Sequence, residues 1–230
     1  MQTVILAAGK GIRLRPLTLK MPKPLLKVGG KPLLEHTFNA LPDKVGEIIL
    51  VVGYLSDQIK KYFGKNYNGR NITYIYQKQQ LGTFNALKQA KSVLGHDFLV
   101  LMGDDLYSRQ DLNRLLEFKN SVLVQKVKGP SEKFGVCMIR NRYWLKDIFE
   151  KQPGINFTFA NCGAFKLTRD IFQEKIIYGP GRSGSEREEW LSSMVGSMAK
   201  KKSIRIVQAT RWFPIATVED ITKADKTYTK

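Results

Sequence analysis

The sequence is poor in cysteine, histidine and acidic residues, and it contains no long hydrophobic run. Among its 230 residues are only two cysteines, Cys137 and Cys162, and two histidines, His36 and His96, which stand far apart. Two cysteines are too few for a disulfide framework, and neither residue type has the spacing of a metal site. We therefore interpret the thiols as small buried groups in a reducing compartment, and we expect a cytoplasmic protein.

No apolar stretch approaches the ~18 residues that a membrane-spanning helix needs, so we expect no contact with a membrane. The apolar run over residues 4–8 is too short for the core of a signal peptide, and no charged segment precedes it. Low-complexity tracts are absent too, and a hydrophobic content of 43% is ordinary for a globular protein. These features favour one folded domain over residues 1–230, with a nucleotide-binding half (1–120) and a sugar-phosphate-binding half (121–230) suggested by the motifs described below.

Acidic residues are scarce relative to basic ones: 20 Asp and Glu face 38 Lys and Arg, which gives a net charge of +18. Such a charge attracts polyanions, whether nucleic acids, anionic membranes or phosphorylated small molecules. The basic residues are spread along the chain, with short concentrations at 60–61 and 200–202, and they do not alternate with aromatic residues as in RNA-binding segments. The charge therefore indicates an affinity for phosphate but no specific nucleic-acid partner.

Short apolar segments alternate with helical patterns in the first half. The patterns predict strands over residues 4–6, 48–52, 71–76 and 98–102, and helices over 33–41, 56–63 and 84–94. Strands that are apolar on both faces and alternate with helices imply an α/β fold whose mostly parallel sheet has helices on both faces. Ligands of such sheets bind beyond the carboxyl ends of the strands, where residues 7–11 and 103–105 supply glycine-rich and acidic sequence.

The second half is less regular. We predict strands over 121–127, 135–140, 143–149 and 203–208, helices over 168–172, 188–199 and 218–228, and loops over 128–133 and 178–185. No linker between the halves is polar enough to force a domain boundary.

The clearest functional motif directly follows the first predicted strand. It consists of L-A-A-G-K-G-I-R-L-R-P-L-T over residues 6–18, P-K-P-L-L over 22–26 and G-K-P-L-L over 30–34. Gly9 and Gly11 let backbone amides approach a phosphate closely. Arg13 can bridge two phosphate oxygens, and Lys23, which we expect in an extended segment between two prolines, adds a compact positive charge.

This motif resembles the opening of the sugar nucleotidyltransferases of the NDP-sugar pyrophosphorylase group, L-A-A-G-x-G-[TS]-R-L-x-P-L-T followed by P-K-P-L and G-K-P-L. The resemblance covers nearly the whole chain. It implies a Rossmann-like α/β core and an Mg²⁺-dependent enzyme that joins a nucleoside triphosphate to a sugar 1-phosphate and releases pyrophosphate. By this resemblance Arg13 and Lys23 are catalytic, stabilising charge on the α-phosphate and the departing pyrophosphate. The residues implied to bind the nucleotide are Leu6, Ala8, Gly9, Gly11, Gln77 and Gly82.

Two further motifs match the nucleotide half of the family. Gln77 can offer paired donor and acceptor atoms to a pyrimidine edge, although a polar residue at a strand end before a helix is the alternative interpretation. Asp104 matches the family's metal ligand, whereas Asp105 would point elsewhere; without the other motifs, two aspartates at a strand end are just as typical of a helix cap. Mg²⁺ keeps several waters, so one or two carboxylates beside a triphosphate suffice.

The second half resembles the family's sugar pocket in the segments F-G-V (134–136), E-K-Q-P (150–153) and N-C-G-A (161–164). The residues implied to bind the sugar phosphate are Gly135, Glu150, Lys151, Asn161, Gly163 and Trp212. In this set Glu150 would accept sugar hydroxyls and Lys151 would bind the phosphate, although the two alone would be interpreted as a solvated turn. Arg187 suits a surface ion pair better than a phosphate contact.

The sequence departs from the family pattern at three places. Ile12 replaces a hydroxyl residue, and Ser192-Ser193 replaces Thr-Asp, which we expect to affect helix packing more than chemistry. W-F-P-I-A-T-V-E-D over residues 212–220 resembles W-x-D-I-G-T-P-E-D, so Pro214 stands where the second metal carboxylate is usual. Relatives that use CTP also have proline there, but they carry an aspartate at the position of Ala216.

These departures leave alternatives open. The chain could be a catalytically idle relative that binds nucleotide or sugar phosphate and regulates a partner, or a binder of polyanions. If the chain is an enzyme, the resemblance suggests glucose 1-phosphate with dTTP or UTP as the default substrates. The tryptophan–proline feature makes CTP a further candidate, and phosphocholine or inositol phosphate are alternative acceptors. Relatives are often dimers or tetramers, and the oligomeric state stays open. We expect no C-terminal β-helix domain, since the sequence ends at Lys230.

Overall fold

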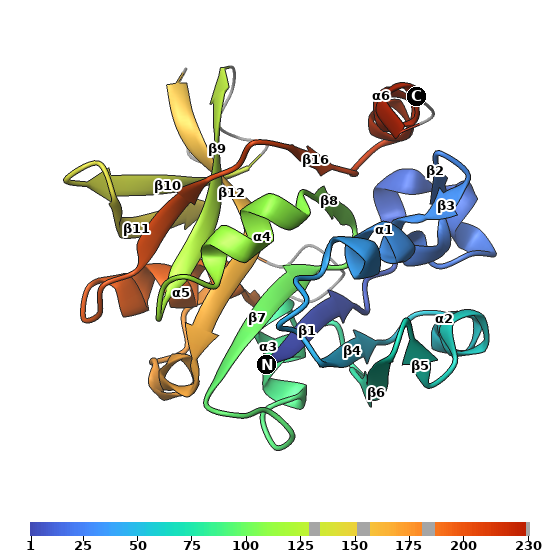
Figure 1. Ribbon diagram of the computed structural model, residues 1–230, viewed down its shortest axis with the longest axis horizontal. Helices are drawn as coiled ribbons and strands as arrows, with labels where there is room; N and C mark the ends of the chain where they lie inside the picture. The colour runs from blue at the N-terminus through green and yellow to red at the C-terminus, as the bar shows by residue number, and fades with distance from the viewer. Residues whose placement is uncertain (129–133, 151–156, 181–186, 229–230) are drawn as a thin grey trace.

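The computed structural model describes residues 1–128, 134–150, 157–180 and 187–228. Its central feature is a sheet of ten strands that carries helices on both faces (Figure 1). The strands of this sheet are β1 (Gln2–Ala7), β4 (Glu47–Val52), β5 (Asn66–Tyr67), β6 (Arg70–Tyr76), β7 (Asp97–Met102), β9 (Ser121–Lys128), β10 (Gly135–Arg140), β11 (Trp144–Glu150), β12 (Phe157–Thr168) and β15 (Arg205–Gln208). Their order across the sheet is β10-β11-β15-β9-β12-β7-β1-β4-β6-β5.

The strands predicted in the first half form the parallel part of the sheet. β1 lies between β4 and β7, with Ile5 opposite both Leu50 and Leu101, and β6 extends the parallel set beyond β4. The five residues that end β1 and the five that end β4 are all buried. Strands buried on both faces are apolar throughout, which is why the apolar runs identified them.

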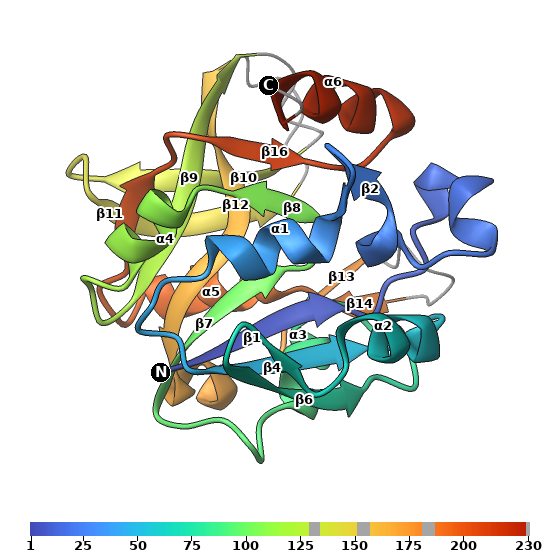
Figure 2. The same cartoon turned by 45° about the vertical axis from the view of Figure 1, so that its right-hand side comes forward.

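Helices cover the sheet on both faces (Figures 1 and 2). The helices are α1 (Leu33–Ala40), α2 (Ser56–Phe63), α3 (Thr83–Gln89), α4 (Arg109–Leu115), α5 (Leu191–Ala199) and α6 (Val218–Tyr228). Val4 and Leu6 of β1 share one apolar cluster with α3 and α5, while Ile5 and Ala7 share another with α1, α2 and α4. Alternate residues of β1 thus pack into two separate hydrophobic cores, one on each face of the sheet, and the expected α/β fold is confirmed.

The second half differs more from the sequence prediction. The longest strand, β12, spans 12 residues that we had not assigned to a strand, and it pairs antiparallel with both β7 and β9. Its pairing register shifts between Asn161 and Phe165, and this bulge hides the regular alternation that identifies a strand. Because β12 bridges β7 and β9, one sheet runs through both halves of the chain.

Three predicted elements of the second half need correction. The helix predicted over 188–199 begins only at Leu191, because β14 (Arg187–Glu189) pairs with β13 (Tyr178–Pro180), inside the predicted loop. The helix predicted over 168–172 is a 3₁₀ turn (Arg169–Gln173) that directly continues β12.

The first half also differs from the prediction at two helices. The helix α3 ends at Gln89, several residues before the predicted end, and the helix α4 was not predicted.

The C-terminal segment returns to the N-terminal one. β16 (Trp212–Pro214) pairs with β8 (Asp105–Tyr107), and α6 packs on the hairpin of β2 (Lys27–Val28) and β3 (Lys31–Pro32). A small apolar cluster that includes Leu14, Leu106 and Ile215 holds these pieces together. The chain thereby brings residues near 14, 105 and 215 to one place.

Both cysteines are free and buried, as the sequence analysis expected. Burial raises the pKa of each thiol above its ordinary value, so both stay protonated. Within the described residues, no helix combines the length and the apolar character that crossing a membrane requires.

Candidate active site

The loop after β1 is held in one conformation by its own side chains. Gly11 has a φ of +62°, and a Cβ there would lie 2.9 Å from Cγ2 of Thr18, so glycine is required. The Thr18 hydroxyl donates a hydrogen bond to the Gly11 carbonyl at 2.8 Å. From the neighbouring strand end, the Tyr54 hydroxyl donates to the carbonyls of Thr18 and Leu19, both at 3.1 Å. The loop is therefore built before any ligand arrives.

Lys23 and Asp104 meet at the carboxyl ends of β1 and β7. Lys23 is only 8% exposed, and its ammonium forms an ion pair with the Asp104 carboxylate, whose side chain is 40% exposed. The turn that carries Asp104 lies directly on β1, because the Gly103 N–H donates to the Leu6 carbonyl at 2.9 Å. Lys23 lies in a 3₁₀ turn (Lys23–Leu25), so our prediction of an extended segment there is wrong. The residue predicted as catalytic thus contacts the residue predicted as a metal ligand.

Arg13 lies on the same loop, in a short 3₁₀ turn (Ile12–Leu14), and is exposed. It makes no hydrogen bond or ion pair with any residue that the structure describes. Gly9 is exposed as well, and within the described chain no atom lies within 4 Å of a Cβ placed on it. Both groups are therefore open to an anionic ligand.

Asp105 points to Trp212 across the β8–β16 pair. Its carboxylate accepts hydrogen bonds from the Trp212 indole N–H at 3.0 Å and from the Ile215 backbone N–H. Pro214 lies opposite Asp105 in this pair. Residue 105 keeps some exposed surface, but protein surrounds its carboxyl group, and this desolvation together with the charge of Asp104 raises the pKa of Asp105 to about 8.

The raised pKa of Asp105 predicts how stability depends on pH. Below a pH of about 8 the folded protein holds a proton that an unfolded aspartate, with a pKa of about 3.9, releases; the stabilisation is complete below about pH 4 and is lost as the pH rises through about 8. Asp105→Asn imitates the protonated side chain. The free energy of unfolding of this variant, relative to that of the unsubstituted protein, should therefore rise between about pH 4 and about pH 8. Urea unfolding without metal or nucleotide measures this difference. Asp57→Asn, at a side chain that is 98% exposed, is the control; parallel pH curves for Asp105→Asn and the unsubstituted protein would contradict the prediction.

Gln77 is buried at the carboxyl end of β6, with 5% of its surface exposed. Its Nε2 donates to the Gly82 carbonyl at 3.3 Å and to Oδ1 of Asn85 at 3.1 Å. Because the Gly82 carbonyl can only accept, the amide orientation is determined, and Oε1 has no partner among the residues described. Nearby, Nε2 of Gln80 donates to the Ala8 carbonyl at 2.9 Å, which ties this segment to the end of β1.

Gly82 has a packing role that the sequence did not reveal. Its φ is +100°, and a Cβ there would lie 2.4 Å from the carbonyl oxygen of Glu189 in β14. The Glu189 N–H also donates to the Leu81 carbonyl at 2.8 Å. The two backbones therefore meet so closely that only glycine fits, independently of any ligand.

Gly135 and Glu150 face one another across β10 and β11. A Cβ on Gly135 would lie 2.8 Å from Oε1 of Glu150, so the missing side chain leaves room for that carboxylate. Ser192, which we expected to affect helix packing more than chemistry, donates a hydrogen bond to Oε1 of Glu150 at 2.5 Å. No sequence motif predicted this contact, because the two residues are 42 positions apart. Lys151 lies outside the described residues.

Asn161 and Gly163 form the bulge of β12. Gly163 has a φ of +68°, and a Cβ there would lie 2.6 Å from Cγ of Met102, the last residue of β7. Its N–H donates to Oδ1 of Asn161 at 3.0 Å, which orients that side chain. The bulge thus brings Asn161 to the same strand end that carries Asp104.

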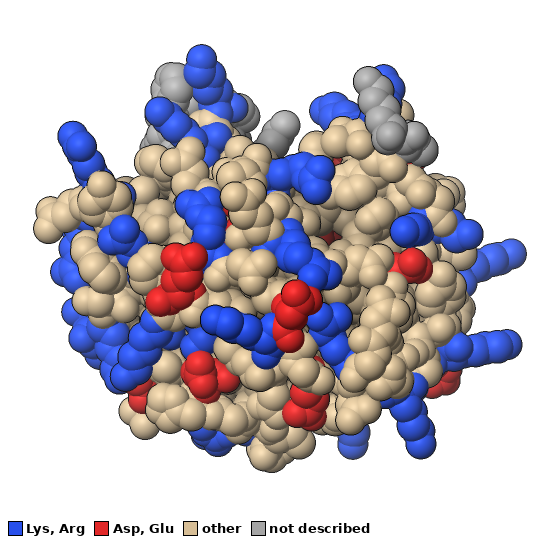
Figure 3. Space-filling model, in the orientation of Figure 1, with Lys and Arg blue, Asp and Glu red and all other residues tan. Residues whose placement is uncertain are grey.

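The surface around these groups is basic but not patterned. In Figure 3, Lys and Arg are spread over the visible face and are interrupted by a few acidic side chains, without forming one patch. The charge of +18 therefore supplies a general attraction for anions, and the specific contacts come from the groups at the strand ends.

Asp104 supplies the carboxylate best suited to Mg²⁺ at these strand ends. Within the described part of the chain, no three Asp, Glu, His or Cys residues lie close enough together to hold a metal ion. Asp104 is partly exposed and has hard oxygens, whereas the carboxylate of Asp105 is engaged by Trp212 and Pro214 offers no ligand atom. This donor set fits an ion held by one carboxylate together with ligand oxygens and waters, as is usual for Mg²⁺ beside phosphates.

The amino-acid sequence of this chain is similar to those of known proteins. The family model described as nucleotidyl transferase matches residues 2–230. The bifunctional protein GlmU of Methanocaldococcus jannaschii is 32% identical over 98% of this chain and 54% of that protein. The UTP–glucose-1-phosphate uridylyltransferase AglF of Haloferax volcanii is 31% identical over 90% of this chain and 88% of that protein. The chain spans between 41% and 54% of the GlmU proteins that it matches.

A solved structure supports the fold. A protein of Bacillus anthracis assigned as a glucose-1-phosphate thymidylyltransferase superimposes with a TM-score of 0.87 at 24% identity, covering 100% of this chain and 96% of that one. At this identity the likeness shows the fold alone. The full-length family match and the AglF relative show that this chain belongs to the nucleotidyl transferase family, in the group of sugar-1-phosphate nucleotidyltransferases.

Proposed function

We propose that this protein transfers a nucleotidyl group from UTP or dTTP to a sugar 1-phosphate, with glucose 1-phosphate as the first candidate, and releases pyrophosphate. The observation that carries the proposal is the buried Lys23 ammonium paired with Asp104 at the carboxyl ends of β1 and β7, beside the Gly11 loop. The name of the Haloferax volcanii relative, a UTP–glucose-1-phosphate uridylyltransferase, supports the same pair of substrates.

The reaction needs no nucleophile from the protein. An oxygen of the sugar phosphate attacks the α-phosphorus of the triphosphate in line, a new P–O bond forms, and the bond to the β-phosphate breaks as pyrophosphate leaves. Such a step is accelerated by positioning and by cations aimed at the developing charge. Arg13 and Lys23 are the residues proposed for this role, and the backbone of the Gly9–Gly11 segment would cradle the phosphates. Mg²⁺ at Asp104 would neutralise charge on the triphosphate.

The orientation of Gln77 favours a base with a ring N–H. Both hydrogens of its amide are directed at Gly82 and Asn85, so the side chain faces a ligand as an acceptor, through Oε1. Uracil and thymine offer a donor at N3, whereas N3 of cytosine is an acceptor. This argument favours UTP and dTTP over CTP, although Pro214 is a feature shared with relatives that use CTP.

Glu150, Ser192 and Asn161 support a sugar as the acceptor. Glu150 accepts a hydrogen bond from the Ser192 hydroxyl and lies beside Gly135, which has no side chain to displace the carboxylate. Asn161 is oriented by the bulge of β12. A carboxylate and an amide that are fixed in this way suit the hydroxyl groups of a sugar ring, which need directional partners.

The test is pyrophosphate release in the presence of Mg²⁺, with ATP, CTP, GTP, UTP and dTTP each paired with a panel of sugar 1-phosphates, phosphocholine and inositol phosphate. We expect release only with UTP or dTTP and a sugar 1-phosphate. Asp104→Asn should weaken the dependence on Mg²⁺, whereas Asp57→Asn, on the exposed side of α2, should not. Release with CTP alone would contradict the interpretation of Gln77, and release with phosphocholine alone would contradict the sugar pocket.

A second candidate is a catalytically idle relative that binds nucleotide or sugar phosphate and regulates a partner. Pro214 favours it, because the position opposite Asp105 provides no second metal carboxylate. In that case the folded protein would gain thermal stability with nucleotide, yet no pair of substrates would release pyrophosphate.

A further inference from the structure

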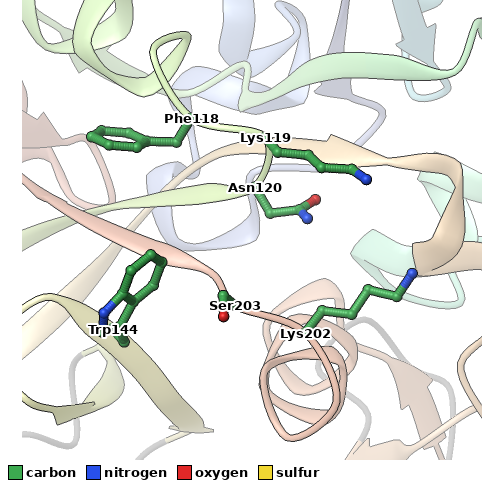
Figure 4. A pocket seen from close by; sticks show the side chains of 6 residues that line it. All are labelled: Phe118, Lys119, Asn120, Trp144, Lys202 and Ser203. Carbon is green, nitrogen blue, oxygen red and sulfur yellow. The ribbon is translucent and has the colours of Figure 1, made fainter.

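The candidate active site lies at the carboxyl ends of the parallel strands, and a cleft lies at the opposite ends of these strands. It has a volume of about 460 Å³ (Figure 4) and is lined by Phe118, Lys119, Asn120, Trp144, Lys202 and Ser203. Asn120 accepts a hydrogen bond from the Thr168 N–H, and Thr168 pairs with Asp97, the first residue of β7. Asp104 follows the other end of β7, and at ~3.3 Å per residue the cleft is roughly 20 Å from it. A volume of this size suits a small ligand.

One end of the cleft is aromatic. Figure 4 shows the rings of Phe118 and Trp144 on the same side, and both residues are half-buried. The guanidinium of Arg205 lies 5.2 Å from the ring centre of Phe118 and 5.4 Å from that of Trp144, so a cation packs against both rings. Rings that keep exposed surface and are fixed in this way are suited to stack on the planar ring of a ligand.

The other end is cationic. In Figure 4 the side chains of Lys119 and Lys202 extend away from the aromatic rings. Lys202 forms an ion pair with Asp170. Two lysines of the cleft therefore stand against this one carboxylate, and the cationic end keeps a positive charge suited to a phosphate group.

Asn120 adds a hydrogen-bond donor between these ends. The residue is only 5% exposed, and its Oδ1 is engaged by the Thr168 N–H at 3.1 Å. Its amide nitrogen has no hydrogen-bond partner in the part of the chain that the structure describes, and Figure 4 shows the amide between Lys119 and Lys202. This nitrogen is not one of the fully buried polar atoms that lack a partner, so it is open to the cleft and can donate to a ligand oxygen there.

We propose that this cleft is a second binding site for a mononucleotide, with its base on Trp144 and Phe118 and its phosphates at Lys119, Asn120 and Lys202. The site shares no residue with the candidate active site. Its occupancy requires no turnover, and the comparison of Lys202→Glu with Lys201→Glu tests it separately from the proposed function.

The experiment counts nucleotides bound per chain by equilibrium dialysis with UTP in the absence of divalent metal. Lys202→Glu reverses a charge that lines the cleft. Lys201→Glu is the matched control, because Lys201 also pairs with a carboxylate, Glu174, but does not line the cleft. We expect two nucleotides per chain for the unsubstituted protein and for Lys201→Glu. Lys202→Glu should weaken one of the two by about tenfold or more, because it removes a cation that can donate to a phosphate oxygen and adds a charge that repels it.

Further variants and probes locate the second nucleotide. Lys119→Glu should act like Lys202→Glu, and Trp144→Phe should remove the quenching of tryptophan fluorescence that a stacked base produces. Uridine and inorganic tripolyphosphate should each bind the cleft more weakly than UTP, because each lacks one half of the ligand. Equal affinities in Lys202→Glu and Lys201→Glu, or tripolyphosphate binding as tightly as UTP, would overturn the proposal.

Discussion

Replacement of Lys23 by alanine is expected to lower kcat for pyrophosphate release by about 10²–10³-fold, which is the usual cost of removing one preorganised group that stabilises the transition state. Lys23 is 8% exposed, so its charge acts in surroundings with little water, where it is stronger than at the surface. The Asp104 carboxylate, which pairs with the Lys23 ammonium, is partly exposed, so water can hydrate this carboxylate once the lysine is replaced. We therefore expect the fold to persist.

Lys27→Ala is the matched control for this prediction. Lys27 follows four positions later and is exposed on β2, so its removal changes the net charge equally without touching the strand ends. The measurement is kcat with saturating UTP and glucose 1-phosphate, accompanied by urea unfolding of both variants. Equal kcat values for Lys23→Ala and Lys27→Ala would contradict the catalytic role of Lys23.

Gly82→Ala is expected to lower the free energy of unfolding by about 3 kcal/mol or more, through backbone strain and overpacking together. The new Cβ would lie 2.4 Å from the carbonyl oxygen and 2.7 Å from the nitrogen of Glu189. Both are backbone atoms of β14, which cannot turn aside as the end of a flexible side chain can. A φ of +100° adds strain for any residue with a Cβ.

Gly69→Ala separates the two causes. Gly69 also has a positive φ, +81°, but in the described chain no atom lies within 4 Å of its Cβ position, so only the strain of about 1 kcal/mol applies. Urea unfolding of both variants compares the effects. If Gly82 served only to let a nucleotide approach, the two variants would lose the same stability, and that result would contradict the packing role. Failure of Gly82→Ala alone to yield folded protein would support it.

The parallel strands were predictable because their signal is local. β1, β4 and β7 are buried on both faces, so each is a continuous apolar run that ends in glycine. β12 was not predictable, because Asn161 and Gly163 interrupt its alternation where the bulge forms. The start of α5 was placed too early, since the residues before it pair as β14 with a strand that lies earlier in the chain.

The residues of the candidate site were likewise predictable only where a local motif marks them. Arg13, Lys23 and Asp104 were identified from motifs of adjacent residues, and the structure brings Lys23 to Asp104. The contact of Ser192 with Glu150 and that of Trp212 with Asp105 join residues 42 and 107 positions apart. No local pattern reports such pairs, because the sheet order decides which strand ends lie side by side.

The α/β class, the parallel strands and the loop that carries Gly11 and Lys23 follow from the sequence alone, because burial and turn chemistry leave periodic or local patterns in it. The packing role of Gly82, the acceptor that Gln77 presents and the cleft around Asn120 become visible only in the folded chain. Each of these depends on a close approach of backbones or side chains from distant segments, and long-range packing leaves no period in the sequence.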